Sequence, residues 1–363
     1  MQPYTPADFD ISPLIVFYET TRACDLKCVH CRADAQPLCH PAELSTRDAK
    51  NLIDELSRFP RPPLLVLTGG DPLKRADIFE LVDYCGEKKV DVAMTPSATP
   101  LVTRAALQSL KDAGLHRLAI SLDGADAATH DAFRRVRGSF ARTLEIMADA
   151  TAIGLPLQVN VTIGRHNVAQ LEALLELAAN AKACLCSVFF LVPTGRATAE
   201  LRLNADECEE VFASLWSWQK SGRLPVKTTE APHYRRFVLQ QQKASPGDRP
   251  ASRGGIPLGQ IGTNDGKGIL FVSHIGEIFP SGFLPIQCGR FPHDSLVDVY
   301  QKNDLFRSLR DADQLGGKCK VCIYRNVCGG SRSRAFGLTG DPLAAEPDCA
   351  YIPARYALEN ATC

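Results

Sequence analysis

The 363-residue sequence has no excess charge of either sign, because 41 Lys and Arg residues balance 41 Asp and Glu residues. A general nucleic-acid binder needs a basic surplus to neutralise phosphates, so the composition argues against that class. No apolar run reaches the roughly 18 residues that span a bilayer. The first residues also lack the basic and apolar segments of a secretory signal. We therefore expect no nucleic-acid or membrane partner, and a cytoplasmic location.

Cysteine, in contrast, is abundant, with 14 residues. Without an export signal these thiols are not expected to form a disulfide framework, because the cytosol keeps thiols reduced. Metal binding or redox chemistry is then the leading hypothesis, and the cysteine positions decide its form.

Short apolar runs alternate with helix-period segments over the first half of the chain. This alternation predicts parallel βαβ units, arranged as an open or partial barrel or as a doubly wound sheet. In either fold the functional face lies at the carboxyl ends of the strands. One intervening helix is predicted to begin at the N-cap Ser45. The predicted strands are Leu14–Tyr18, Leu64–Thr68, Val90–Thr95, Arg117–Ser121, Leu157–Thr162 and Cys186–Leu191.

The pattern changes after about residue 200. Asn204–Lys220 predicts an amphipathic helix, Gln240–Gly268 a flexible loop or linker, and Gly268–Val272 with Glu277–Pro280 a β-hairpin. The remaining residues are turn-rich and dense in cysteine, so that segment would need a metal to hold it. We therefore divide the chain into residues 1–200, a bridging helix and linker over 201–267, and a C-terminal unit over 268–363.

Three cysteines directly follow the first predicted strand: Cys24, Cys28 and Cys31. Thiolates at this spacing can ligate three irons of a [4Fe–4S] cluster and leave the fourth iron open to a small molecule. A zinc site closed by His30 or Cys39, or buried cysteines that happen to lie close together, would also fit this spacing. The position at the end of a strand favours the cluster.

The C-x-x-x-C-x-x-C pattern at this place, followed by further βα units, resembles the radical S-adenosylmethionine (radical SAM) superfamily over about the first 200 residues. That resemblance implies an α/β fold with a partial (β/α)6 barrel of TIM type. It also implies an enzyme in which a reduced cluster donates one electron to SAM. The products are methionine and a 5′-deoxyadenosyl radical, which removes a hydrogen atom from a substrate. An electron donor such as flavodoxin or ferredoxin is implied as a partner.

Further motifs carry the same resemblance in the expected order. Thr68-Gly-Gly-Asp-Pro72 is similar to the family segment whose backbone meets the amino group of SAM, and glycines allow such close approach. Ser121-Leu-Asp-Gly124 stands where the family contacts SAM. Arg134 resembles the arginine that pairs with the SAM carboxylate, and His30 the aromatic residue beside the adenine. The implied cofactor-binding residues are His30, Gly69, Gly70, Asp71, Ser121 and Arg134.

A second group of cysteines lies near the C-terminus: Cys319, Cys322, Cys328 and Cys349. The spacing alone also allows a structural zinc ribbon. Beside a radical SAM domain, the segment resembles the SPASM domain, which carries auxiliary [4Fe–4S] clusters. The sequence departs from that pattern at three places, with no cysteine in 261–275, Ser281 for a second cysteine and Arg332 for a third. These positions serve the auxiliary cluster nearer the active site, so the resemblance implies one remaining auxiliary cluster, held by the four cysteines.

The remaining cysteines have no implied ligand role, except that Cys288 could substitute for a lost ligand. They are Cys39, Cys85, Cys184, Cys186, Cys208, Cys288 and Cys363.

Residues that could contact a substrate are fewer. Val192–Arg196 follows the last predicted strand and could contact SAM or substrate. Lys227–Arg236 contains Lys227, His233, Arg235 and Arg236 and could bind carboxylates, although a solvated, charged helix start would have the same composition. His274 and Arg332 are weaker candidates.

Among SPASM-bearing enzymes, the chain resembles those of the heme and heme d1 biosynthesis branch, in motifs such as Pro193-Thr-Gly-Arg196. That resemblance implies action on a tetrapyrrole side chain. The alternative is a maturase that modifies a ribosomally made peptide or protein. A third hypothesis, from another class, is a non-enzymatic iron–sulfur or zinc binding protein.

Overall fold

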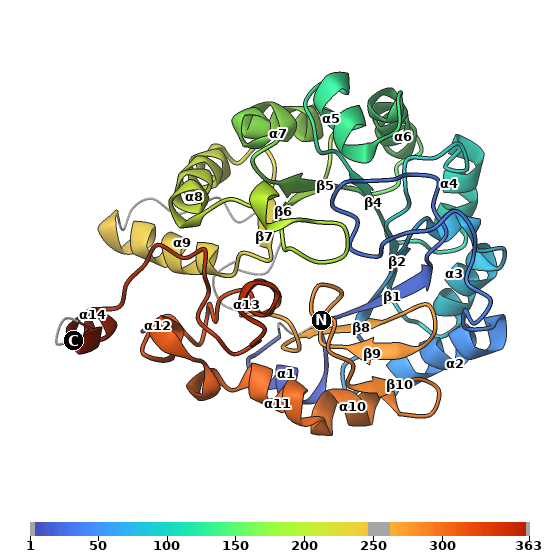
Figure 1. Cartoon of the computed structure of the whole chain (residues 1–363). Coiled ribbons are helices and arrows are strands. Elements are labelled where there is room, and N and C mark those ends of the chain that lie inside the picture. The colour runs from blue at the N-terminus through green and yellow to red at the C-terminus, as the bar shows by residue number, and fades with distance from the viewer. Residues whose placement is uncertain (1–3, 246–261, 361–363) are drawn as a thin grey trace.

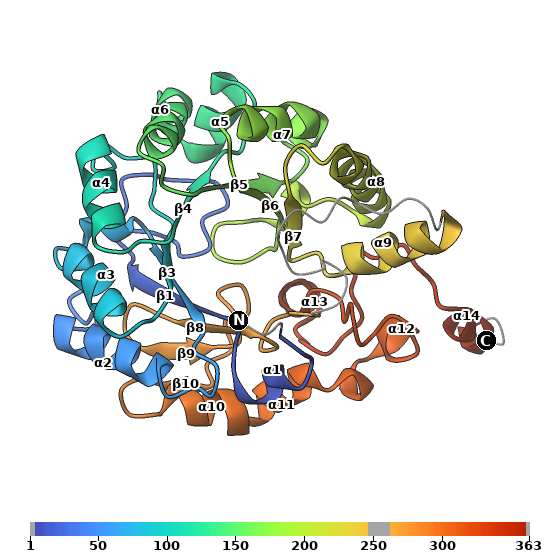
Figure 2. The same cartoon turned by 180° about the vertical axis from the view of Figure 1, so that it is seen from behind.

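The computed structural model of the chain describes residues 4–245 and 262–360. These residues form one ten-stranded sheet in the order β10-β9-β8-β1-β2-β3-β4-β5-β6-β7. Every pairing from β8 through to β7 is parallel, whereas β8–β9 and β9–β10 are antiparallel. The sheet curves around a central space with helices outside it, which is the predicted partial barrel rather than a doubly wound sheet (Figures 1 and 2).

The strands have the following bounds. They are β1 (Ile15–Thr21), β2 (Leu64–Gly69), β3 (Val92–Met94), β4 (Arg117–Ser121), β5 (Leu157–Ile163), β6 (Leu185–Phe190), β7 (Val226–Thr229), β8 (Ile269–Val272), β9 (Glu277–Phe279) and β10 (Gly289–Arg290). The helices that follow the first seven strands or lie between them are α2 (Thr46–Leu56), α3 (Ile78–Glu87), α4 (Arg104–Asp112), α5 (Ala127–Arg134), α6 (Ser139–Ala152), α7 (Leu171–Asn180), α8 (Ala205–Ser221) and α9 (His233–Ala244).

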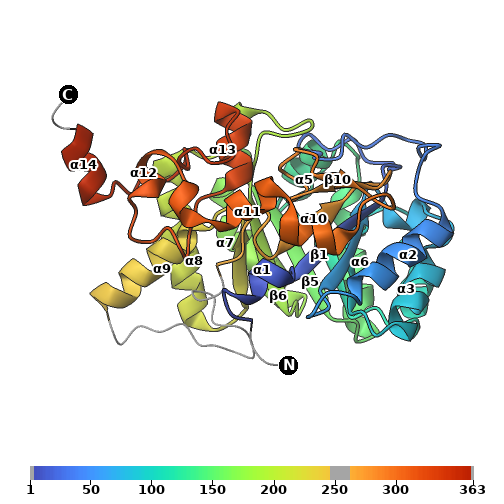
Figure 3. The same cartoon turned by 90° about the horizontal axis from the view of Figure 1, so that it is seen from below.

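Shorter helices complete the chain at its two ends and in its loops. They are α1 (Asp8–Ile11), α10 (Leu296–Lys302), α11 (Asp304–Arg310), α12 (Gly317–Lys320), α13 (Arg332–Thr339) and α14 (Ala354–Asn360), with 3₁₀ turns η1 (Pro72–Lys74), η2 (Val168–Gln170), η3 (Ala199–Leu201) and η4 (Ala312–Gln314). Seen from below, α12, α13 and α14 lie beside α8 and α9 at one end of the barrel (Figure 3).

The six predicted strands are all present, with ends shifted by a few residues. The capping signals also hold: Ser45 accepts a hydrogen bond from the backbone of Asp48 at the start of α2, and Asn204 forms a capping box with Glu207 in α8. The prediction of a loop from Gln240 is wrong as far as Ala244, because this stretch is the end of α9. Residues 246–261 of that predicted linker lie outside the described residues.

Strand alternation decides which side chains face the interior of the barrel. On β2, Leu65 and Leu67 pack against the helices, whereas Leu64, Val66 and Thr68 line the central space. On β4, Leu118 and Ile120 likewise join the outer core while their neighbours face inward. The main apolar core therefore lies between the sheet and the helices, and the interior of the barrel is left as a cavity.

The predicted hairpin is present as β8 and β9, and it is part of the barrel sheet. β8 runs parallel to β1, with Ile15 opposite Ile269. The carbonyl of Gly268, just before β8, accepts hydrogen bonds from the amides of Leu14 and Ile15 (2.9 and 3.1 Å). The pairing therefore joins the first strand to a strand that lies about 250 residues later in the sequence.

Within the described residues, no helix is both long and apolar enough to cross a membrane.

The buried hydroxyl of Tyr300 connects the residue before β8 to helix α1 by hydrogen bonds. Tyr300 in α10 accepts a hydrogen bond from the Gly268 amide (3.0 Å) and donates one to the Phe9 carbonyl (2.7 Å). Tyr300→Phe would leave both backbone groups without this partner, and such a loss costs about 1–3 kcal/mol. We expect the free energy of unfolding, measured by urea denaturation, to fall by this amount. The control Tyr4→Phe removes only a longer, part-buried bond of 3.3 Å to Pro13 and should change it less. Equal urea midpoints for Tyr300→Phe and the wild type would contradict this role.

Candidate active site

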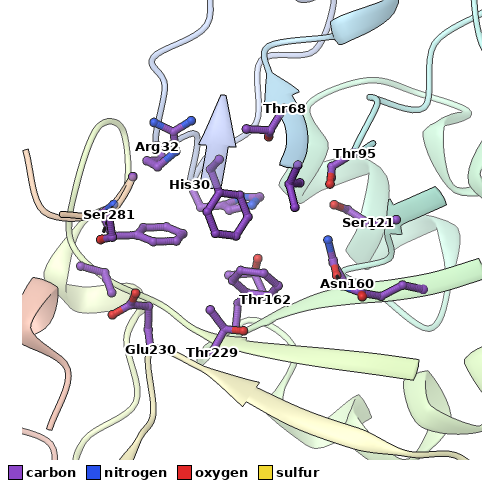
Figure 4. A pocket seen from close by; sticks show the side chains of 18 of the residues that line it. His30, Arg32, Thr68, Thr95, Ser121, Asn160, Thr162, Thr229, Glu230 and Ser281 are labelled. Carbon is purple, nitrogen blue, oxygen red and sulfur yellow. Dashed lines mark hydrogen bonds between the residues drawn. The ribbon is translucent and has the colours of Figure 1, made fainter. Parts of the chain in front are cut away.

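The barrel encloses a cavity of about 550 Å³, which is lined by residues from the amino ends of the strands to the loops at their carboxyl ends. His30, Arg32 and Thr68 lie in the upper part of the view around this space, Ser281 lies below Arg32, and Glu230 lies at the lower left (Figure 4). The candidate residues can therefore be judged by whether they reach this cavity.

The three cysteines after β1 all line the cavity. Each sulfur receives a hydrogen-bond donor: the Leu26 amide donates to Cys24 Sγ and the Ala35 amide to Cys31 Sγ (both 3.4 Å), and Arg134 Nη1 donates to Cys28 Sγ (3.6 Å). Donors of this kind stabilise thiolates that ligate iron–sulfur clusters. Within the described residues, no group of three His, Cys, Asp or Glu residues is arranged to hold a single metal ion. Three thiolates that each accept a hydrogen bond fit the ligand set of a cluster bound by three cysteines.

Gly69 and Gly70 lie directly against the backbone that leads into the cysteine loop. A Cβ at Gly69, where φ is +139°, would lie 2.2 Å from the Thr21 carbonyl oxygen. A Cβ at Gly70 would lie 2.3 Å from the Ala23 carbonyl oxygen. Any larger residue at these positions would push the cysteine loop away, so both glycines are required by packing as well as by their place on the cavity wall.

Asp71 does not line the cavity with its neighbours. Its buried carboxylate accepts hydrogen bonds from the Leu73 amide (3.2 Å) and from the Thr99 hydroxyl (2.7 Å). The residue therefore caps the η1 turn and fixes the end of β2. Ser121, at the end of β4, does line the cavity.

Arg134 reaches the cavity from the end of α5 and is held by a carboxylate that the sequence motifs did not single out. Its guanidinium donates to Asp123, which is fully buried and also accepts from the Thr162 amide (2.6 Å). Burial alone would raise the pKa of Asp123, but the Arg134 charge holds it below its usual value. Asp123 is part of the Ser121–Gly124 motif. Its position directly after a predicted strand is the sequence signal that could have identified it as a site residue.

His30 presents an aromatic plane to the cavity. Its ring stacks on Phe133 (centroids 4.3 Å apart), which in turn stacks on His166 (3.7 Å). Burial lowers the pKa of His30 to about 3, so its ring is neutral. The residue can therefore contact a flat, uncharged ring face, as an aromatic side chain does.

Comparison with known proteins identifies the family. The Radical SAM superfamily model matches residues 18–178. An AdoMet-dependent heme synthase of Methanosarcina barkeri is 36% identical, and the match covers 95% of this chain and 98% of that protein. The chain belongs to the radical SAM superfamily. Membership implies a [4Fe–4S] cluster and SAM as cofactors, and an enzyme that catalyses radical chemistry.

Two further proteins are similar to this chain, one in sequence and one in fold. A mycofactocin maturase of Mycobacterium tuberculosis is 32% identical over 93% of this chain and 83% of that protein. The crystal structure of Streptococcus suis SuiB bound to precursor peptide SuiA is similar in fold, with a TM-score of 0.72 and 17% identity over 94% of this chain and 76% of that one. The second likeness supports the radical SAM partial barrel and nothing about the substrate.

In this radical SAM chain, the four C-terminal cysteines surround a second, small cavity. Three of their sulfurs accept backbone hydrogen bonds, from the amides of Glu346 to Cys319 (3.3 Å), Tyr324 to Cys322 (3.4 Å) and Gly330 to Cys328 (3.4 Å). Arg236, Lys318 and Arg325 also line this cavity. These amide donors and cations would stabilise a cluster ligated by four thiolates.

The predicted carboxylate-binding segment is the wall between the two cavities. It is strand β7 and the buried start of α9, so the alternative of a solvated helix start is wrong. Lys227 and Arg235 face the barrel cavity, whereas His233 and Arg236 face the four cysteines. Arg236 is paired with Glu209.

The Val192–Arg196 loop packs on the cysteine loop. Arg196 Nε donates to the Cys28 carbonyl (3.0 Å), and a Cβ at Gly195 (φ +59°) would lie 2.4 Å from the Cys31 carbonyl. Of this loop, Val192 does reach the cavity wall. The Val192–Arg196 loop therefore holds the cysteine loop in place, a role that its sequence did not predict.

The positions at which SPASM cysteines are missing have other partners here. Ser281 lines the barrel cavity and hydrogen-bonds Ser333 (3.2 Å), and Arg332 is buried with its guanidinium on the carbonyls of Pro342 and Ala344. Cys288 packs against the barrel core rather than lining either cavity. His274 pairs with Glu19. No disulfide joins the described cysteines, and Cys363 lies outside the described residues.

The packing of Gly70 predicts a sensitive position. Gly70→Ala must displace the backbone at Ala23, one residue before Cys24, so we expect it to retain less than half of the wild-type iron after anaerobic reconstitution. The control Gly86→Ala lies in α3, where the nearest atom to a new Cβ is 3.7 Å away, and should keep the wild-type iron content. Wild-type iron content and SAM affinity in Gly70→Ala would contradict this account.

Proposed function

We propose that this radical SAM enzyme abstracts hydrogen from a side chain of a tetrapyrrole, in a reaction of heme-type biosynthesis. The observation that carries this proposal is the two-sided wall of the barrel cavity. One side is apolar and aromatic, and the other is polar. The apolar side comprises Ile15, Phe17, Leu64, Val66, Ile269 and Phe271, and the polar side Arg117, Ser121, Gln158, Asn160 and Thr162.

A tetrapyrrole matches this division, because it is a flat apolar ring with charged carboxylate arms. Burial of a large ring against apolar side chains contributes about 25 cal/mol per Å² of apolar area. The name of the heme synthase relative, which matches nearly the full length of both chains, supports the same substrate class.

The proposed roles of the cavity residues follow from their placement. Cys24, Cys28 and Cys31 hold the cluster, which, when bound and reduced, supplies the electron that cleaves SAM to methionine and the 5′-deoxyadenosyl radical. Arg134 can donate to the SAM carboxylate with the guanidinium hydrogens that Asp123 and Cys28 leave free. His30 offers its ring plane to the adenine.

The remaining SAM-binding residues act through the ends of two strands. Gly69 and Gly70 bring their backbone close to the amino group of SAM, and Asp71 holds this turn in position. Ser121 supplies a hydroxyl at the same edge of the cavity. Oriented groups of this kind keep a substrate close to the radical and away from water.

The C-terminal unit, residues 268–363, is proposed to hold one auxiliary [4Fe–4S] cluster on Cys319, Cys322, Cys328 and Cys349, as in a SPASM-like domain. Residues 1–200 are proposed as the radical SAM unit and 201–267 as the bridge, which adds β7 to the same sheet. Because β8 pairs with β1, the C-terminal unit is joined to the barrel by backbone hydrogen bonds. The proposed electron donor is a flavodoxin or ferredoxin.

Iron content tests the two clusters. We expect about eight irons per reconstituted chain and about four in a Cys24/Cys28/Cys31→Ala variant, which should also form no 5′-deoxyadenosine from SAM and a strong reductant. A Cys319/Cys322→Ala variant should keep about four irons and still cleave SAM. Replacement of the exposed Cys39 and Cys184 by Ala is the control and should change neither value. About four irons in the wild type would contradict the auxiliary cluster.

The substrate class is tested by coupling to SAM cleavage. We expect 5′-deoxyadenosine formation to rise at least several-fold when iron coproporphyrin III is added. Deuterium placed on the side chains of that tetrapyrrole should appear in the 5′-deoxyadenosine by mass spectrometry, because the radical takes up the hydrogen atom that it abstracts. A peptide maturase is the second candidate, because the mycofactocin maturase is also similar over most of the chain. Stimulation by a short precursor peptide and not by the tetrapyrrole would favour the maturase. Bound clusters without any SAM cleavage would favour the non-enzymatic binding protein.

A further inference from the structure

Two cations lie near the amino ends of their strands, deep in the barrel cavity. Arg117 is the first residue of β4 and Lys227 the second of β7, and both line the cavity. Ser121, at the other end of β4, is four residues from Arg117, which is about 13 Å along a strand. Arg117 is therefore far from the edge at which the three cysteines lie, and Lys227 is near enough to Arg117 for the two charges to interact.

Neither cation has an acidic partner among residues 4–245 and 262–360. Within these residues the guanidinium of Arg117 donates only to the side-chain amide of Gln158, at 3.4 Å, and the Lys227 ammonium has no hydrogen bond or ion pair. The other cations on the cavity wall are satisfied: Arg32 pairs with Glu19, Arg134 with Asp123, and Arg235 donates to backbone carbonyls.

The environment of Lys227 also disfavours its charge when the cavity holds no anion. Burial, and then the charge of Arg117, lower the pKa of the Lys227 ammonium to about 8. The two acidic side chains on the cavity wall, Glu230 and Asp265, interact with each other. Arg117 and Lys227 are both half-buried on the cavity wall. Two like-charged groups in such a place, without counterions, repel each other unless a ligand supplies the negative charge.

We propose that Arg117 and Lys227 form a carboxylate-binding subsite that anchors an anionic arm of the substrate at the base of the barrel. The inference rests on the proposed function, which supplies the molecule that bears this arm. The arm would be a propionate-type side chain other than the one that reacts. The apolar wall then contacts the ring between the subsite and the SAM edge. Such an anchor fixes which side chain of a polycarboxylate lies beside SAM.

Binding of iron coproporphyrin III to the anaerobically reconstituted full chain, followed by absorbance, tests the subsite. We expect Lys227→Met and Arg117→Gln each to weaken binding roughly tenfold to hundredfold, since a hydrogen bond to a charged group contributes that much. Lys227→Arg, which keeps the charge, should bind within a few-fold of the wild type. The wild type should bind the tetramethyl ester of the same ring about as weakly as the variants bind the acid.

Matched controls separate this role from general effects of charge and folding. Arg104→Gln and Lys243→Met remove exposed cations and should bind as the wild type does. The thermal midpoint of ligand-free Lys227→Met should equal or exceed that of the wild type, because an unpaired, half-buried charge is removed. A lower midpoint together with lost iron would assign Lys227 a structural role and overturn the inference. A loss of SAM affinity in Lys227→Met would assign the pair to the cofactor and would also overturn it.

The failure of the subsite can be distinguished from the failure of the proposed function. If the tetrapyrrole binds equally well to the wild type, to Lys227→Met and as its ester, the subsite is wrong and the function is unaffected. If no tetrapyrrole binds, glutarate is the second probe. A rise in thermal midpoint with glutarate that requires Lys227 would support the subsite and overturn the tetrapyrrole, whereas no rise would overturn both.

Discussion

Close contact between backbones at the ends of the strands is the constraint on which the rest of the site depends. The cysteine loop rests on the main chain of Gly69 and Gly70 on one side and of Gly195 on the other, at distances that exclude a Cβ. Arg196 then hydrogen-bonds the loop from outside. Three sulfurs can be presented in fixed directions only if the loop that carries them cannot relax. The radical SAM motif is therefore as much a packing arrangement as a set of ligands.

The same side-chain alternation that builds the outer core also shapes the cavity. Because every second residue of a strand faces inward, polar side chains on β4 and β5 become one wall and apolar side chains on β1, β2 and β8 the other. A barrel interior usually fills with branched side chains. Here small or polar residues such as Ala119, Ser121 and Asn160 leave room for a ligand, which is why the interior can be a reaction chamber.

The sequence allowed the barrel to be predicted because its signals are local. Apolar runs, caps such as Ser45 and the spacing of Cys24, Cys28 and Cys31 all lie within short stretches. Strand β7 was missed because its four residues include Lys227 and two threonines and show no apolar run. The pairing of β8 with β1 joins residues about 250 positions apart, for which one sequence carries no signal. Asp71 was expected beside SAM, but its carboxylate turns to Thr99, a contact that depends on how two loops fold together.

A buried ionic network links the second cysteine group to the barrel cavity. Arg334 pairs with Glu346 (2.8 Å) and donates to the carbonyl of Glu230 (2.8 Å), while the Glu346 amide donates to Cys319 Sγ (3.3 Å). Burial favours a raised pKa for Glu346, but Arg334 lowers it to about 2, so the pair stays ionised. Breaking such a pair leaves an uncompensated buried charge, which costs several kcal/mol. The cysteine segment and the cavity wall at Glu230 are therefore held in one arrangement, and a displacement of Cys319 would be transmitted to a residue that faces the substrate space.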